Sequence, residues 1–220
     1  NGKDSIPDKM VISLKGKRKL YKNDIMMYEM LARHNWTRPL YMSTTLGSDS
    51  QAGLEKFLML EGLAARITPF ASQNEMVDTQ RMYDNFMKKF RFGNIADPNV
   101  YVDQTIMRMC YTHRMRMVQL AAQLAKEGRK KEALEVLNKC EKVFPAQQVP
   151  YDFFSLGFSP NGRQFLMPQL YHELGRDADA RRILTAVAKN TMQYMNWAST
   201  LPEVHNSLTL LWVVACSNII

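Results

Sequence analysis

The chain has 220 residues, 46% of them apolar, and its 29 Lys and Arg against 21 Asp and Glu give a net charge of +8. This length and apolar content argue against a disordered chain and allow one large domain or two small ones. Seven basic residues fall in the first 22 positions, and our first interpretation is a solvated basic arm. The alternatives are contact with an anionic membrane surface or with a phosphate-bearing ligand. Nucleic acid is disfavoured, because the basic residues are not interleaved with aromatic ones.

Residues 1–72 are predicted to form a small α/β subdomain. The expected elements are a strand at 10–14, a helix capped by Asn23 or Asp24 and ending near 34, a strand at 40–45, a helix at 54–60 and a strand at 65–68. The apolar face of the first helix consists of Ile25, Met26, Met30 and Leu31. A β-α-β unit would pair the first two strands in parallel.

Residues 73–220 are predicted to be helical throughout. Asn74 caps a helix over residues 75–90, and Asp103 begins a long helix that ends near Lys126. The apolar stripe of the 75–90 helix consists of Met76, Met82, Tyr83, Phe86, Met87 and Phe90. A last helix is expected from Pro202 to Ala215.

Two helical hairpins of the tetratricopeptide kind are predicted within this part. In that repeat, small residues stand where two antiparallel helices cross, and glycine stands in the turn between them. The first copy consists of Leu120, Ala121, Leu124, Gly128, Ala133, Leu137, Cys140 and Pro145. The second copy consists of Met167, Tyr171, Gly175, Ala180, Leu184 and Val187, with Pro168 replacing a small residue. The turn glycines lie 47 positions apart, so residues 146–161 are an insertion beyond the usual repeat length.

Two further features of the helical part allow either packing or recognition. The first repeat helix carries Met107, Met109, Met115 and Met117, which suit a core or an adaptable partner groove. The insertion at 147–158 carries Tyr151, Phe153, Phe154 and Phe158. These aromatic side chains would either pack back onto the helices or stack on a sugar or peptide.

No recognised catalytic or cofactor motif occurs in the sequence. Walker, dinucleotide, nucleophile-elbow and zincin motifs are absent, so we predict no catalytic residues, no cofactor and no metal. Cys110 and His113 have metal-ligand spacing, but two ligands do not make a zinc site. The three cysteines, Cys110, Cys140 and Cys216, imply no disulfide framework.

Several short segments together resemble a known family. They are Asn35-Trp36-Thr37-Arg38-Pro39-Leu40-Tyr41-Met42, Gly53-Leu54-Glu55-Lys56-Phe57, Glu61-Gly62-Leu63-Ala64-Ala65-Arg66-Ile67-Thr68-Pro69, the stretch at 85–94, and Tyr101-Val102-Asp103. This set resembles the C-terminal region of a bacterial family of multi-spanning membrane proteins related to protein O-mannosyltransferases. Phe92 replaces the family's usual Trp, and Ala65 replaces an aromatic residue.

The resemblance implies a location and a parent protein. The missing N-terminal part would be a polytopic, glycosyltransferase-like body that uses a lipid-phosphate-linked sugar and carries the catalytic acid. This fragment would lie on the periplasmic side of the inner membrane, tethered through that part. The absence of an initiator Met agrees with a fragment.

The residues that carry this resemblance leave two interpretations open. An ion pair between Arg38 and Glu61 would join two elements. Alternatively, Trp36, Arg38, Tyr41, Glu61 and Arg66 would line a binding cleft, where Trp stacks on a sugar and Arg holds an anion.

The predicted fold class is therefore α+β, mostly α. The predicted function is a non-catalytic accessory or recognition domain of a membrane glycosyltransferase-like protein, which binds acceptor or partner polypeptide on the helical-repeat face. The alternative is a stand-alone tetratricopeptide scaffold with no link to glycosyl transfer.

Overall fold

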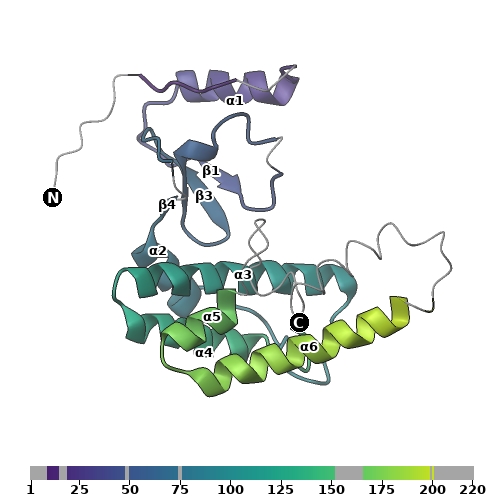
Figure 1. Ribbon diagram of the computed structural model, residues 1–220. Helices are drawn as coiled ribbons and strands as arrows, with labels where there is room; N and C mark the ends of the chain where they lie inside the picture. The colour runs from purple at the N-terminus through teal and green to yellow at the C-terminus, as the bar shows by residue number, and fades with distance from the viewer. Residues whose placement is uncertain are drawn as a thin grey trace. The chain divides into compact units, whose positions relative to one another are not determined.

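The computed structural model describes residues 9–14, 19–47, 50–73, 76–151, 166–198 and 200. The chain divides into two compact units, Asn1–Asn85 (unit 1) and Phe86–Ile220 (unit 2), and the fold is α+β, mostly α (Figure 1). The division lies downstream of our predicted boundary between residues 72 and 73.

Unit 1 is built on a four-stranded sheet with the order β1-β3-β2-β4. Its strands are β1 (Tyr41–Ser43), β2 (Leu58–Leu60), β3 (Ala64–Ile67) and β4 (Met76–Val77). β3 pairs antiparallel with both β1 and β2, whereas β2 pairs parallel with β4. The strand predicted at 40–45 is therefore present but shorter, and the one predicted at 65–68 is present one residue earlier.

The two faces of this sheet differ in burial because side chains alternate along each strand. One face carries Met42, Leu60, Ala65 and Ile67, all of which are buried. Met42 and Ile67 join a hydrophobic cluster with Leu31, Leu54 and Phe57. The opposite face carries Tyr41, Met59 and Arg66, which are exposed or half-buried.

Residues 10–14 do not form the predicted strand. Met10 and Ile12 nevertheless pack against the core cluster, while Val11 is exposed. The alternation that suggested a strand is real, but no neighbouring strand pairs with this segment in the described residues. The predicted parallel β-α-β unit is therefore wrong.

Helix α1 (Lys22–Ala32) begins one or two residues before the predicted cap. Its N-cap is Tyr21, and Asp24 accepts a hydrogen bond from the Tyr21 backbone N–H at 2.9 Å. Of the predicted apolar face only Leu31 is buried, whereas Ile25, Met26 and Met30 are exposed. The buried side is formed instead by Asp24, Leu31 and the half-buried Met27, and α1 lies beside the sheet in Figure 1.

Two predicted helices are broken up. The predicted 54–60 helix is a single 3₁₀ turn, η2 (Glu55–Phe57), followed directly by strand β2. The predicted 75–90 helix begins later, as α2 (Thr79–Asp84), because Asp78 caps it by accepting the Arg81 N–H at 3.0 Å. It continues as the π-helical turn η3 (Asn85–Lys89). Asn74, the predicted cap, lies outside the described residues.

Unit 2 contains two helical hairpins that pair in chain order. α3 (Gln104–Lys126) packs on α4 (Lys130–Val143), α5 (Leu166–Glu173) packs on α6 (Asp177–Ala198), and α3 also contacts α5 (Figure 1). Asp103 caps α3 as predicted, accepting the Ile106 N–H at 2.8 Å. The short connections force each pair to run antiparallel.

The small residues lie where the hairpin prediction requires them. Ala121 and Ala133 are fully buried and Ala180 is nearly so, which allows the paired helices to approach closely. Gly128 and Gly175 stand in the two turns, with φ of 80° and 75°. Pro168 lies in the first turn of α5, where its missing N–H has no intrahelical partner in any case.

Some predictions fall on residues that the structure does not describe. These are the helix expected at 202–215, Cys216 and most of the insertion, including Phe153, Phe154 and Phe158. Among the described residues, no helix combines the length and hydropathy that a bilayer crossing requires.

Candidate functional site

The polar face of the unit 1 sheet carries a cluster of three side chains around one buried carboxylate. Glu61, whose side chain is 5% exposed, accepts hydrogen bonds from Tyr41 Oη at 2.8 Å and from Arg81 Nη1 at 3.0 Å. Arg66 Nε lies 2.6 Å from Glu61 Oε1, a close charge contact without hydrogen-bond alignment. We call these four residues the Glu61 cluster.

Four different elements position the Glu61 cluster. Tyr41 and Arg66 are opposite each other in the β1–β3 ladder, and Met59 is opposite Arg66 in the β2–β3 ladder. Glu61 follows β2 by one residue and so returns to the same face as Met59. Arg81 comes from the first turn of α2, which Asn85 ties to the cluster by donating to the Glu61 carbonyl at 2.8 Å.

The electrostatics of the cluster favour the charged pair and the neutral phenol. The hydrogen bond to Glu61, helped by burial, raises the pKa of Tyr41, so the phenol stays a donor. The same carboxylate raises the pKa of the Arg81 guanidinium. The carboxylate thus faces two cations, of which Arg66 is 30% exposed and Arg81 48% exposed. These guanidinium groups can offer further N–H donors to an anion.

The predicted cleft is only partly assembled. The structure brings Tyr41, Glu61 and Arg66 together but leaves Trp36 and Arg38 elsewhere. Trp36 packs on the core cluster that contains Met42, the neighbour of Tyr41 on the opposite face of β1. Arg38 is exposed, and the predicted Arg38–Glu61 ion pair is wrong, because Arg66 and Arg81 are the cations that pair with Glu61.

Trp36 is held in a strained turn. Its φ is 59°, a left-handed value that is unusual for an aromatic residue. Its backbone N–H donates to His34 Nδ1 at 2.9 Å, and the two rings meet edge to face with centroids 4.9 Å apart. Asn35 Oδ1 accepts both the N–H and the hydroxyl of Thr37, which closes the turn. The hydrogen bonds of this turn therefore hold Trp36 against the core.

The predicted aromatic site in unit 2 is described only at Tyr151. This side chain is buried, and its ring stacks on the Arg114 guanidinium, 4.8 Å from the ring centroid. Its hydroxyl donates to Glu141 Oε1 at 3.1 Å. Arg182 also pairs with Glu141, at 2.7 Å, and thereby links α6 to α4. Burial, followed by the charge of Glu141, raises the pKa of Tyr151 to about 12.

Arg114 is a fully buried cation in the middle of α3. Its guanidinium donates to the backbone carbonyls of Phe144 at 2.9 Å, Val149 at 2.5 Å and Pro150 at 3.0 Å. These carbonyls belong to the segment that leaves α4 and enters the insertion. Arg114 therefore fixes the start of the insertion to α3.

The methionines and the Cys110–His113 pair have separate environments. Met117 is fully buried and Met109 is 57% exposed, so the methionines of α3 divide between core and surface. His113 packs edge to face against Phe92, with centroids 6.0 Å apart. Cys110 and Cys140 are buried free thiols. Among the described residues, no group of His, Cys, Asp and Glu could hold a metal ion.

Sequence reasoning missed Arg81 and Arg114. Arg81 joins the cluster through a contact twenty residues distant in the sequence, for which no local signal exists. Arg114 was detectable, because it occupies the apolar stripe that Cys110, Met117 and Ala121 define on α3. A cation in such a stripe predicts a buried polar anchor.

The comparison with protein families bears on unit 1. Residues 1–85 match the model of a family described as TMEM260-associated domain 2. All four residues of the Glu61 cluster lie within the matched part. No curated protein and no solved structure matches the chain.

Proposed function

We propose that this chain is a non-catalytic accessory and recognition domain of a membrane glycosyltransferase-like protein. The observation that carries the proposal is the match of residues 1–85 to a TMEM260-associated domain, since TMEM260 is a predicted O-mannosyltransferase-like protein. The sequence resemblance to the O-mannosyltransferase-related family supports the same assignment. It also motivates a location on the periplasmic side of the inner membrane.

The hairpins supply the recognition surface in this proposal. Their turn glycines, buried alanines and ordered pairing agree with a tetratricopeptide-like arrangement, whose helices typically bind extended polypeptide. On α3, Ile106 is 40% exposed and Met109 is 57% exposed. Met107 and Met115 on the same helix are half-buried. Flexible methionines suit an acceptor or partner polypeptide of variable sequence.

The Glu61 cluster has a structural part in this proposal. Its carboxylate joins β2, β3, β1 and α2 through three partners, which holds the sheet of unit 1 together. No nucleophile with an adjacent base takes part in the cluster, so we assign it positioning rather than chemistry. Sugar transfer itself would belong to the membrane-embedded part of the parent protein.

The proposal is tested in the full-length parent protein, purified from membranes. An Ile106→Ser and Met109→Ser double variant removes the exposed apolar side chains of α3. We expect the yield of glycosylated acceptor protein to fall about tenfold, because polypeptide recognition weakens while the transferase body is unchanged. The matched control is Leu184→Ser with Met192→Ser, which removes exposed apolar side chains from α6.

Two results would refute the proposal. The first is a full-length protein that transfers no sugar to any acceptor. The second is an unchanged glycoprotein pattern after the α3 substitutions, with unchanged capture of polypeptide by the hairpins. The alternative, a stand-alone scaffold, is favoured by the hairpins alone. It predicts a parent chain with no transmembrane spans, so the length and hydropathy of that chain distinguish the two.

A further inference from the structure

Exposed apolar side chains are concentrated in the first part of unit 1. Seven of the sixteen large hydrophobic residues that are exposed in the described chain lie between positions 11 and 30. They are Val11, Leu14, Leu20, Tyr21, Ile25, Met26 and Met30. Val11 is 80% exposed, Tyr21 63% and Met26 60%, so these side chains stand well outside the core. We call the four on or beside α1, Tyr21, Ile25, Met26 and Met30, the α1 face.

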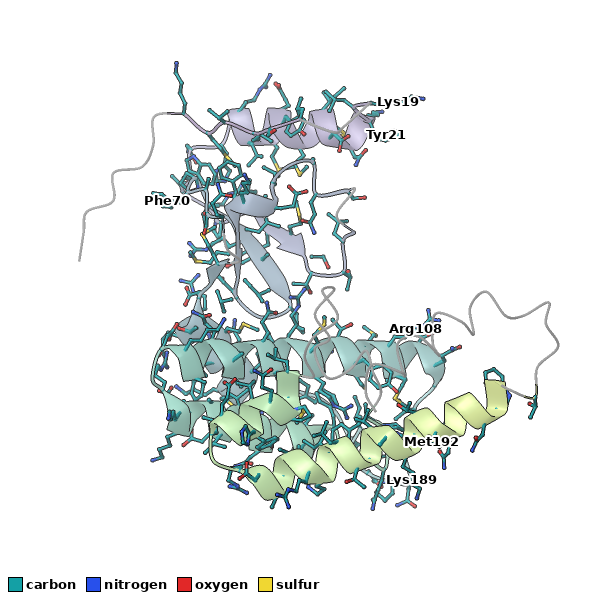
Figure 2. All side chains as sticks on the ribbon, viewed as in Figure 1. Lys19, Tyr21, Phe70, Arg108, Lys189 and Met192 are labelled. Atoms are coloured by element: carbon teal, nitrogen blue, oxygen red, sulfur yellow. The ribbon has the colours of Figure 1, made fainter. Side chains whose placement is uncertain are left out.

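Cations are interspersed with this apolar surface. Lys9, Lys19, Lys22 and Arg33 are all exposed, and Figure 2 shows Lys19 and Tyr21 at the same end of α1. The two carboxylates of α1 do not cancel these charges. Asp24 is buried and caps the helix, and Glu29 is paired with Arg33 at 2.5 Å. Lys9, Lys19 and Lys22 therefore leave a net positive charge beside the apolar residues.

The α1 face is held rigidly from behind. Leu31 and Met27 pack into the core cluster, and Tyr28 Oη donates to the Ala52 carbonyl at 2.6 Å. The 9–14 segment packs beside them through Met10 and Ile12. The apolar side chains are thus presented on an ordered helix, and docking them costs little conformational entropy.

We propose that the α1 face docks on an anionic lipid bilayer surface. Ile25, Met26 and Met30 enter the boundary between headgroups and acyl chains, and Tyr21 lies at headgroup level. Lys19 and Lys22 contact lipid phosphates and carboxylates, while Lys9 adds to the attraction at longer range. Charge complementarity selects this occupant, because a neutral apolar partner would leave the interspersed lysines without a counter-charge. The proposal is independent of polypeptide recognition by the hairpins.

The test measures flotation of the 220-residue chain with lipid vesicles. The chain is expected to bind vesicles of phosphatidylcholine with one part in about three of phosphatidylglycerol, and to bind pure phosphatidylcholine far more weakly. Lys19→Gln with Lys22→Gln should lower the partition coefficient about 25-fold, at about fivefold for each cation. Ile25→Ser with Met26→Ser should lower it about tenfold and should still do so at high salt, where Coulomb attraction is screened.

Matched controls on α6 separate this face from general adsorption of a basic protein. Lys189 and Met192 are both exposed there and are labelled in Figure 2. Lys189→Gln and Met192→Ser should leave vesicle binding within twofold of the unsubstituted chain. Circular dichroism verifies that every variant is folded.

Three results would overturn the proposal. They are no flotation with anionic vesicles, equal losses from the α6 controls, and binding that ignores the apolar substitutions. Sedimentation of the free chain identifies a competing occupant. Self-association that Ile25→Ser with Met26→Ser abolishes, without vesicle binding, would assign the α1 face to a second copy of the chain.

Discussion

The two units stabilise a buried charge in opposite ways. In unit 1 we consider the buried anion Glu61, whose partners are two guanidinium groups and a phenol. In unit 2 it is a cation, Arg114, whose partners include three neutral backbone carbonyls and the Tyr151 ring. Both arrangements join segments that are distant in the sequence. The contacts named for Glu61 include opposite formal charges, whereas those named for Arg114 are with neutral groups.

This difference predicts unequal costs of disruption. The partners of Glu61 are partly exposed, so water can solvate Arg66 and Arg81 if the carboxylate is lost. Two of the carbonyls around Arg114 lie in the interior, because they belong to Phe144 and Val149, which are at most 1% exposed. Water reaches these carbonyls poorly, and their unmet hydrogen bonds would cost the full desolvation penalty.

Arg114→Met gives the largest expected effect. The substitution keeps an unbranched apolar stem but removes three hydrogen bonds to carbonyls, two of which are buried. We expect a loss of about 4 kcal/mol in unfolding free energy. Urea denaturation followed by circular dichroism measures the loss, and amide hydrogen exchange in α4 localises it to unit 2. Arg108→Met is the control, because Arg108 is exposed on the same helix (Figure 2) and should change stability by less than about 0.5 kcal/mol. Equal losses in the two variants would refute the anchoring role of Arg114.

Glu61→Gln should destabilise unit 1 by about 3 kcal/mol, because Arg66 and Arg81 lose the charge of the buried carboxylate that they share. Arg81 then retains its longer contact with Asp78, at 3.7 Å. Arg81→Met should cost about 1 kcal/mol, since Arg81 is nearly half exposed and Arg66 remains to pair with the carboxylate. The rate of hydrogen exchange at the β3 amides measures both losses of stability. Glu55→Gln, at an exposed glutamate of η2, serves as the control and should leave β3 unchanged. Faster exchange after the control substitution alone would contradict this account.

The sequence predicted unit 2 well because its signals are local. Asp103 as a cap, Gly128 and Gly175 as turns, and Ala121 and Ala133 as crossing points each act within a few residues of the structure that they specify. The repeat pattern likewise picked out Leu120, Ala121 and Leu124, which are buried on α3. Arg114 was the exception, since its role depends on carbonyls 30 or more residues away.

Unit 1 was predicted less well because its sheet depends on long-range pairing. The 10–14 segment has the alternation of a strand, yet nothing in its own sequence reveals whether a strand pairs with it, and none does among the described residues. Arg38 and Arg66 were equally plausible partners for Glu61 from residue type alone. In the structure the β2–β3 hairpin places Arg66 beside Glu61, and α2 places Arg81 there as well. Face alternation in β1 places Tyr41 and Met42 on opposite faces, and Trp36 packs against the core cluster that contains Met42.

Gly53→Ala tests how tightly the N-terminal segment is packed in unit 1. Gly53 has a φ of 77°, and an added Cβ would lie 2.5 Å from the Ser13 carbonyl oxygen. Gly128→Ala in unit 2 has a similar φ of 80° but meets nothing within 4 Å. We expect losses of about 2 and about 1 kcal/mol, because both variants carry the left-handed strain and only the first displaces the backbone. Urea denaturation measures the unfolding free energy of both variants. Equal losses would show that the 9–14 segment moves aside without cost when the Cβ is added.

The smallest expected effect is that of Tyr151→Phe, about 1 kcal/mol at neutral pH. The ring remains over Arg114, and what is lost is the hydroxyl group with its bond to Glu141 and its contact with Arg182. The stabilisation by the Tyr151 hydroxyl depends on pH above about pH 10. The pKa of Tyr151 rises from 10.0 to about 12 on folding, so the folded state retains a proton that the unfolded chain releases. This contribution is complete below pH 10 and is lost as the pH rises through about 12.

The difference in unfolding free energy between the native chain and Tyr151→Phe should therefore shrink over that interval. Tyr171, whose pKa burial also raises, is present in both proteins and cancels in the comparison. A difference that stays constant from pH 9 to pH 12 would mean that the Tyr151 hydroxyl is solvated in the folded state, and that Arg114 alone fixes the start of the insertion.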